Sequence, residues 1–148
     1  MLFSFVVKYL GFLKVIPLLA QIFDNVMKLW LFVVDPERLD LLDELENTAL
    51  KWEQTSVALH QYGGIQFNFS GKEFAHVHSN GILDTLLSAQ IKSDLILANK
   101  VSEHHLITKS GWVTYYLKDK EGLALAIDLL ALAYNRVASR KVLATKLA

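Results

Sequence analysis

The chain has 148 residues, the length of one domain with a single substantial core. Its 15 basic and 15 acidic residues balance, which argues against nucleic acid as the main partner because phosphate binding needs a surplus of cations on one face. There is no cysteine, so disulfides, thiolate metal sites and a cysteine nucleophile are excluded.

The first 34 residues hold most of the apolar surplus, yet they do not predict a membrane span. A span needs about 20 consecutive apolar residues. Lys8, Lys14, Asp24 and Lys28 interrupt every window of that length. The opening MLFSFVV also lacks the basic region and the small-residue cleavage site of a secretory signal.

Residues 12–34 predict an amphipathic helix with a broad apolar side, because their polar residues gather on one narrow face. The apolar side would dock on the domain itself, on a second copy in a homodimer, or on a membrane surface. Docking or dimerisation is favoured, because a membrane anchor usually has a more cationic polar face. We therefore divide the chain into a helical segment, 1–34, and a domain, 35–148. We expect a cytoplasmic location, with peripheral membrane contact as the alternative.

From residue 35 onward the pattern predicts one α+β domain. Asp35-Pro36 has the N-cap and first-position residues of a helix, and leucine spacing continues that helix to about Lys51. Alternating apolar residues and the turns between them then predict an antiparallel meander. Its strands cover 55–61, 65–69, 73–78 and 82–87.

The second half predicts a short helix over 89–98, strands over 104–107 and 112–117, and a last helix from near Asp119. The last helix has an apolar stripe that should be buried, formed by Leu123, Ile127, Leu130 and Tyr134. We therefore predict a two-layer fold, an antiparallel sheet with helices on one face. The order of elements also looks like that of the small frataxin-like sandwich.

All five histidines fall within residues 60–105. His76 and His78 alternate on one predicted strand, so they share a face with Phe74. A three-residue loop at 79–81 would place Asp84 opposite His76, where a carboxylate prepares an imidazole as a general base. A two-residue loop would instead turn Asp84 to the other face, and both registers stay open.

A second interpretation makes the histidines ordinary core residues. A two-residue turn at 70–71 would place Phe67 and Phe69 on the same face as Phe74 and the histidines. That face would then be apolar and covered by a helix. Histidines in sheets are usually structural, so this interpretation stays open beside the functional one.

A histidine pair followed by His104 and His105 is also typical of metal ligands. Zinc or iron would be held by neutral imidazoles and one carboxylate, either Asp84 or Glu103. Two features argue against it. A cupin-like site has a glutamate a few residues after the pair, and this chain has none there. Adjacent histidines on a strand also point to opposite faces, so only one can join. We expect no metal and no cofactor.

Four segments in this order resemble the luciferase-like domain of fungal luciferases and many uncharacterised bacterial proteins: GGIQFNFSGKEFAHVHSNGILD, EHH, SGWVTYYL and AIDLLALAY. The similarity covers about residues 50–137. Fungal members are oxygenases that oxidise a hydroxylated pyrone with molecular oxygen and emit light, and they carry a hydrophobic N-terminal segment. By position, the resemblance implies these site residues: His76, His78, Asp84, His104, His105 and Trp112.

Three functions are open. The first is the oxidation of a small aromatic or pyrone-like ligand by a cofactor-independent oxygenase. In it His76 or His78 is the base and His104 or His105 stabilises an oxyanion. Its ligand-binding residues would be Trp112, Phe74 and Tyr116. The second is a non-catalytic binding or interaction module, peripheral at a membrane or dimeric through residues 12–34. The third is a structural role with inert histidines.

Overall fold

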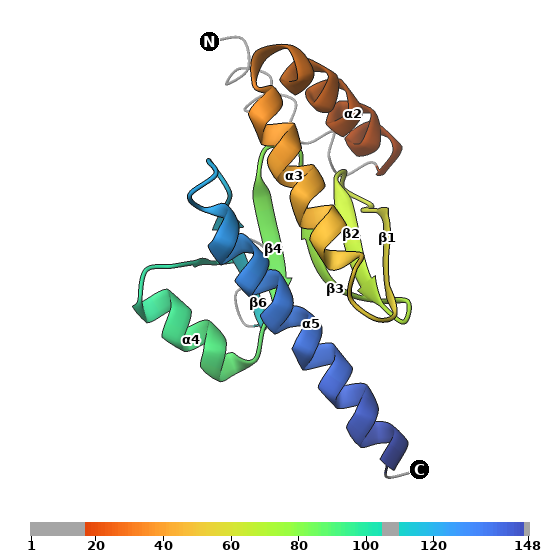
Figure 1. Cartoon of the computed structure of the whole chain (residues 1–148), viewed down its shortest axis with the longest axis vertical. Coiled ribbons are helices and arrows are strands. Elements are labelled where there is room, and N and C mark those ends of the chain that lie inside the picture. Colours follow the sequence, from red (N-terminus) through yellow and green to blue (C-terminus); the bar gives the residue numbers. More distant parts are fainter. Residues whose placement is uncertain (1–16, 105–109, 147–148) are drawn as a thin grey trace.

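The computed structural model describes residues 17–104 and 110–146 of the chain, and Figure 1 shows their arrangement. The first half of the described part contains α2 (Pro17–Val34), α3 (Pro36–Ala49), β1 (Thr55–Leu59), β2 (Ile65–Phe69), β3 (Lys72–Val77) and β4 (Ile82–Leu86). The second half contains α4 (Ala89–Leu97), β5 (Ser102–Glu103), β6 (Trp112–Tyr116) and α5 (Leu123–Lys146).

The strands form one antiparallel sheet in the order β1-β2-β3-β4-β6-β5. Helices α3 and α5 lie across one face of it (Figure 1), with α5 in contact with β2, β3 and β4. The core lies between these two layers and includes Leu42, Leu45, Phe67, Phe74, Val77, Leu83, Val113, Leu129 and Leu130. The predicted α+β fold is confirmed.

Most predicted boundaries agree with the structure to within a few residues. Asp35 caps α3, because its side chain accepts a hydrogen bond from the backbone nitrogen of Arg38 at 3.3 Å. The last helix begins at Leu123 rather than near Asp119. The carboxylate of Asp119 instead accepts a hydrogen bond from the backbone nitrogen of Gly122, at 3.0 Å, in the turn that precedes the helix. In the stripe predicted to be buried, Leu123 and Leu130 are buried, and Ile127 and Tyr134 are half-buried.

The strand predicted over 104–107 is placed differently. The residues that pair with β6 are Ser102, opposite Thr114, and Glu103, opposite Val113. His104 follows the strand rather than beginning it. The rest of the predicted strand, including His105, lies within 105–109 and outside the described residues.

A β-bulge in β3 decides which side chains reach the helices. Phe67 pairs with Ala75, but the next residue of β2, Asn68, pairs with Glu73. Strand β3 therefore has one extra residue, Phe74, at this point. Phe74 is fully buried, and its ring lies 6.3 Å from that of Phe67, on the helix-covered side. The bulge also brings Glu73 and His76, three residues apart, onto the other face.

The register between β3 and β4 is the one given by a three-residue loop. His76 pairs with Asp84, and the backbone nitrogen of His78 donates to the carbonyl of Ile82 at 2.9 Å. The 79–81 loop closes with a hydrogen bond from the nitrogen of Gly81 to the carbonyl of His78, also at 2.9 Å. Of the two registers that the sequence left open, this one places Asp84 beside His76.

Helix α2 packs against α3 and is tied to the 79–81 loop by Asp24. The Asp24 carboxylate accepts hydrogen bonds from the hydroxyl and the backbone nitrogen of Ser79, at 2.7 and 3.2 Å. The other side of α2 is apolar and at least half exposed at Ile22, Val26, Leu29, Trp30, Phe32, Val33 and Val34. A membrane surface or a second subunit on this side stays a prediction. Among the described helices, none has both the length and the hydrophobicity to cross a bilayer.

The loop before β2 has room for glycine alone at position 64, which yields a matched test. Gly64 and Gly71 both have positive φ, +90° and +79°. A Cβ at Gly64 would lie 2.2 Å from the carbonyl oxygen of Val77, whereas one at Gly71 would meet nothing within 4 Å. We expect Gly64→Ala to lower the free energy of unfolding by about 1–3 kcal/mol more than Gly71→Ala, since overpacking adds to the cost of positive φ. Equal losses in urea denaturation would contradict this.

The Asp24 contact predicts a pH-dependent contribution to stability. Burial alone would raise the pKa of Asp24, but the hydrogen bonds from Ser79 and the charge of Lys28 outweigh burial and lower it. A lowered folded-state pKa stabilises the fold above the unfolded value and loses that contribution as pH falls through the folded value. Asp24→Ala should cost about 1.5–3 kcal/mol near neutral pH, the range of hydrogen bonds to charged groups. The difference from the unmodified chain should shrink below pH 4.

The control is Asp40→Ala, because Asp40 is an exposed carboxylate on α3. Urea denaturation of both variants at neutral and acidic pH should give a pH-dependent loss for Asp24→Ala only. An Asp24→Ala loss that stays the same at both pH values would show that the carboxylate charge contributes nothing.

Candidate functional site

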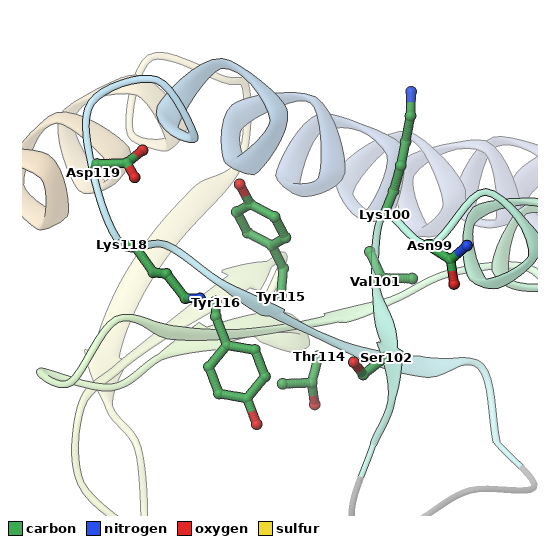
Figure 2. A pocket seen from close by; sticks show the side chains of 9 residues that line it. All are labelled: Asn99, Lys100, Val101, Ser102, Thr114, Tyr115, Tyr116, Lys118 and Asp119. Carbon is green, nitrogen blue, oxygen red and sulfur yellow. The ribbon is translucent and has the colours of Figure 1, made fainter.

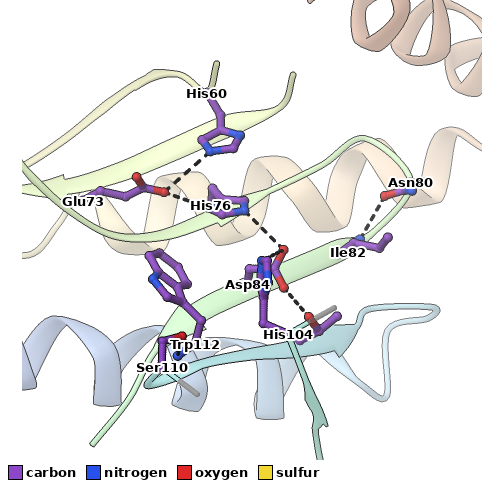
Figure 3. Close-up of polar contacts among 10 residues, drawn as sticks. His60, Glu73, His76, Asn80, Ile82, Asp84, His104, Ser110 and Trp112 are labelled. Carbon is purple, nitrogen blue, oxygen red and sulfur yellow. Dashed lines mark hydrogen bonds and ion pairs between the residues drawn. The ribbon is translucent and has the colours of Figure 1, made fainter. Parts of the chain in front are cut away.

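The candidate site lies on the sheet face opposite α3 and α5, where polar side chains from several strands meet (Figure 3). Three paired strands bring His76, Asp84 and Thr114 side by side, because each pairs directly with the next. Around them lie His60, Glu73, His78, His104 and Trp112.

His76 is held between two carboxylates. Its Nδ1 lies 2.7 Å from Oε1 of Glu73, and its Nε2 lies 3.2 Å from Oδ2 of Asp84. Burial of the ring disfavours the charged form, but the two carboxylates outweigh burial and raise the pKa of His76 above its ordinary value. The arrangement fixes the orientation of the imidazole through both nitrogens.

Asp84 is the most buried group of the cluster, with 1% of its surface exposed. Its Oδ1 accepts a hydrogen bond from the hydroxyl of Thr114 at 2.5 Å. Its Oδ2 lies 3.2 Å from Nε2 of His76 and 3.7 Å from Nε2 of His104. Burial would raise the pKa of Asp84, but the neighbouring imidazoles and the Thr114 hydroxyl hold it below its ordinary value. The carboxylate is therefore ionised at neutral pH.

His60 and His78 complete the cluster from the end nearest the loops. The His60 ring stacks on that of His76, with centroids 3.9 Å apart and planes 10° apart. His78 meets both rings edge-on, at 5.6 and 5.3 Å. Burial and the charges of His76 and His60 lower the pKa of His78 to about 4. Burial and His76 also lower the pKa of His60. Both rings are therefore neutral at pH 7.

The structure brings together five of the predicted site residues: His76, His78, Asp84, His104 and Trp112. The Trp112 ring centroid lies 5.3 Å from that of His76 and 6.3 Å from that of His104. His105 lies outside the described residues.

Two predicted ligand-binding residues lie elsewhere. Phe74, expected beside His76 and His78, is fully buried on the helix-covered face because of the β3 bulge. Tyr116 is 52% exposed, two residues beyond Thr114 on β6. It lines a pocket of about 350 Å³ beside β5 and β6 (Figure 2), whose lining includes Thr114 but none of the histidines that the structure describes.

Sequence reasoning missed three residues of the cluster: His60, Glu73 and Thr114. Spacing did not predict Glu73, because residues three apart on a regular strand point to opposite faces and only the bulge places Glu73 on the face of His76. Thr114 is the cross-strand neighbour of Asp84 and could have been found from the β4–β6 pairing. His60 begins the loop to β2, where its backbone is hydrogen-bonded to Gly63 and Gly64, both with positive φ, and this loop conformation could not be read from strand spacing.

A family model matches the part of the chain that contains most of this cluster. The family model of the luciferase domain matches residues 71–133, from the β2–β3 turn into α5. Over these residues the chain is similar to the luciferase domain family. The matched region of the luciferase domain contains His76, Asp84, His104 and Thr114, whereas His60 precedes it. No curated protein and no solved structure matches the chain, so the frataxin-like comparison concerns the order of elements alone.

Proposed function

We propose that this luciferase domain catalyses the oxygen-dependent oxidation of a small aromatic or pyrone-like ligand, with His78 as the base. The family match supports the reaction class, since fungal members oxidise a hydroxylated pyrone. The observation that carries the choice of base is the position of His78. It is half-buried, whereas His60, His76 and His104 are buried, so its imidazole is the most accessible one among the described histidines.

The proposed reaction begins with a proton transfer. His78 takes an acidic proton from the ligand and leaves an electron-rich anion. The anion gives an electron pair to molecular oxygen as a carbon–oxygen bond forms, so the ligand is oxidised and the oxygen is reduced to the peroxide level. The peroxide then takes the proton back from His78. The sum is the addition of one oxygen molecule to the ligand, with no external reductant.

The neighbours of His78 have supporting roles in this proposal. His104 is the candidate for stabilising the negative charge that develops on the ligand or on oxygen. Trp112 provides an aromatic wall next to His76 and His104. Glu73 and Asp84 hold His76 in place, which keeps the face beside His78 rigid.

The alternative function is a binding module without chemistry. It is favoured by the pocket of about 350 Å³ beside β6, which lies within the size range of small-molecule sites. Its lining includes Thr114, Tyr115 and Tyr116 but none of the four histidines in the described part of the chain. Ligand binding in this pocket would leave the histidine cluster as a structural feature of the same sheet.

Oxygen uptake with hydroxylated pyrones and phenols tests the proposal. We expect uptake that depends on one of these compounds, and a rate at least about 100-fold lower for His78→Gln, because general bases contribute roughly 10²–10⁴-fold. Glutamine keeps bulk and hydrogen bonding, so the melting temperature should change little. The control is Lys72→Gln at the start of β3, the strand that His78 follows; Lys72 is exposed, and the variant should keep the full rate.

Two results would contradict the proposal. One is ligand binding, measured by equilibrium dialysis, without oxygen uptake, which would favour the binding module. The other is a His78→Gln protein that keeps the full rate of uptake, which would remove His78 as the base. A large fall in melting temperature without a specific loss of rate would make the residue structural.

A further inference from the structure

We propose that His76, Asp84 and His104 bind a divalent first-row transition ion, of the class of Fe²⁺ or Zn²⁺. The inference concerns the face used by the proposed oxidation but goes beyond it, because metal binding can be measured without turnover. Three elements provide the ligands: β3, β4 and the residue that follows β5. All three side chains are buried.

The first argument is the convergence of donor atoms. One ligand atom from each of the three residues lies within 4.8 Å of the other two. Oδ2 of Asp84 lies 3.2 Å from Nε2 of His76 and 3.7 Å from Nε2 of His104. An ion that binds nitrogen and oxygen at about 2.0–2.1 Å holds neighbouring donors roughly 3–3.5 Å apart. The triad therefore needs little rearrangement to bind such an ion.

The second argument is the state of Asp84 Oδ2. This oxygen is buried and accepts no hydrogen bond from the part of the chain that the structure describes. Nε2 of His76 lies 3.2 Å from it and Nε2 of His104 lies 3.7 Å from it, so both imidazoles are within ion-pair distance of this oxygen. A buried, ionised oxygen that accepts no hydrogen bond is costly. A cation bound between the oxygen and the two nitrogens would give the Asp84 oxygen a direct partner.

The third argument concerns the groups behind the ligands. The Nδ1 of His76 is hydrogen-bonded to Glu73 at 2.7 Å, and the second oxygen of Asp84 is hydrogen-bonded to Thr114. Metal-binding histidines usually donate their other ring N–H to a carboxylate or a carbonyl, which directs the lone pair of the remaining nitrogen at the metal. Figure 3 shows this chain of contacts from Glu73 through His76 to Asp84.

A second group of donors, His60, His76 and His78, is less suitable. It also has ligand atoms within 4.8 Å of one another. However, the rings of His60 and His76 are stacked nearly parallel, 3.9 Å apart. The lone pairs of an imidazole nitrogen lie in the ring plane, so two stacked rings cannot both point at one ion. The group also lacks a carboxylate to balance the charge of a divalent ion.

The position of Asp84 answers one of the reasons for which the sequence spoke against a metal. That argument required a glutamate soon after the histidine pair, but the carboxylate comes from Asp84 on the neighbouring strand. Two imidazoles and one carboxylate leave other coordination positions open, as in non-haem iron and catalytic zinc sites, and unlike closed structural zinc sites. The alternative to a metal ion is a proton on Nε2 of His76, which would also balance the negative charge of Asp84. The metal-binding experiment distinguishes the ion from the proton.

The test is metal binding by the purified full chain after treatment with a chelator. Zn²⁺ or Co²⁺ is added in air and Fe²⁺ under anaerobic conditions, and bound metal is measured by equilibrium dialysis with elemental analysis. We expect about one ion per chain. The variants Asp84→Asn and His104→Gln should each weaken binding by at least about 100-fold, since loss of even an outer-shell partner costs about 10–100-fold. Circular dichroism should show that both variants keep their fold.

The matched control is Glu103→Gln, which removes the carboxylate next to His104, and it should bind as the unmodified chain does. If the unmodified chain binds none of the three ions, the proposal is overturned, and a proton on Nε2 of His76 would take the place of the metal. Loss of binding in His60→Gln and His78→Gln with retention in Asp84→Asn would overturn it in favour of the other group. Because oxygen uptake is measured separately, a failure here is distinguishable from a failure of the proposed oxidation.

Discussion

One extra residue in β3 decides what each face of the sheet can do. With the bulge at Phe74, the aromatic side chains of β2 and β3 enter the core under α5, while Glu73 and His76 meet on the opposite face. A regular strand would instead separate Glu73 from His76. A local irregularity of the backbone thus lets one six-residue strand contribute an aromatic side chain to the core and two polar side chains to the cluster on the other face.

Burying the ionisable side chains of the cluster costs free energy of folding. Asp84, His76, His60 and His104 are all buried, and burial disfavours their charged forms. The negative charges of Asp84 and Glu73 lie beside imidazoles: both carboxylates contact His76, Glu73 also lies near His60, and Asp84 lies near His104. The pKa values move in opposite directions as a result, up for His76 and down for His60 and His78. Titratable groups pushed apart in this way are typical of functional sites, although structural networks produce them as well.

Much of the fold follows from local sequence signals. The Asp35-Pro36 cap, the alternation around Phe67 and the glycine turns placed α3 and the four strands of the meander to within a few residues. The pairing of strands that are far apart in the sequence was harder to predict. The position of β5 depends on which residues pair with Val113 and Thr114, and the sequence around His104 does not contain that information.

The candidate site could be predicted only in part, for the same reason. Spacing on one strand grouped His76 with His78, and one of two registers gave Asp84. Glu73 required the bulge, and His60 required a loop that glycine alone can form at position 64. The expectation that Phe74 lies beside the histidines was wrong because it assumed a regular strand. Side chains within one element follow its period, whereas a site built from five segments depends on tertiary packing.

In the proposed metal site, β3, β4 and the residue that follows β5 place their donor atoms around Asp84 Oδ2. Anomalous X-ray diffraction from crystals grown with Zn²⁺ would measure this most directly, because it locates the ion itself. We expect a single strong peak within about 2.0–2.2 Å of His76, Asp84 and His104, with Glu73 still bonded to Nδ1 of His76. A peak at His60 and His78, or an ordered cluster with no peak at all, would contradict it.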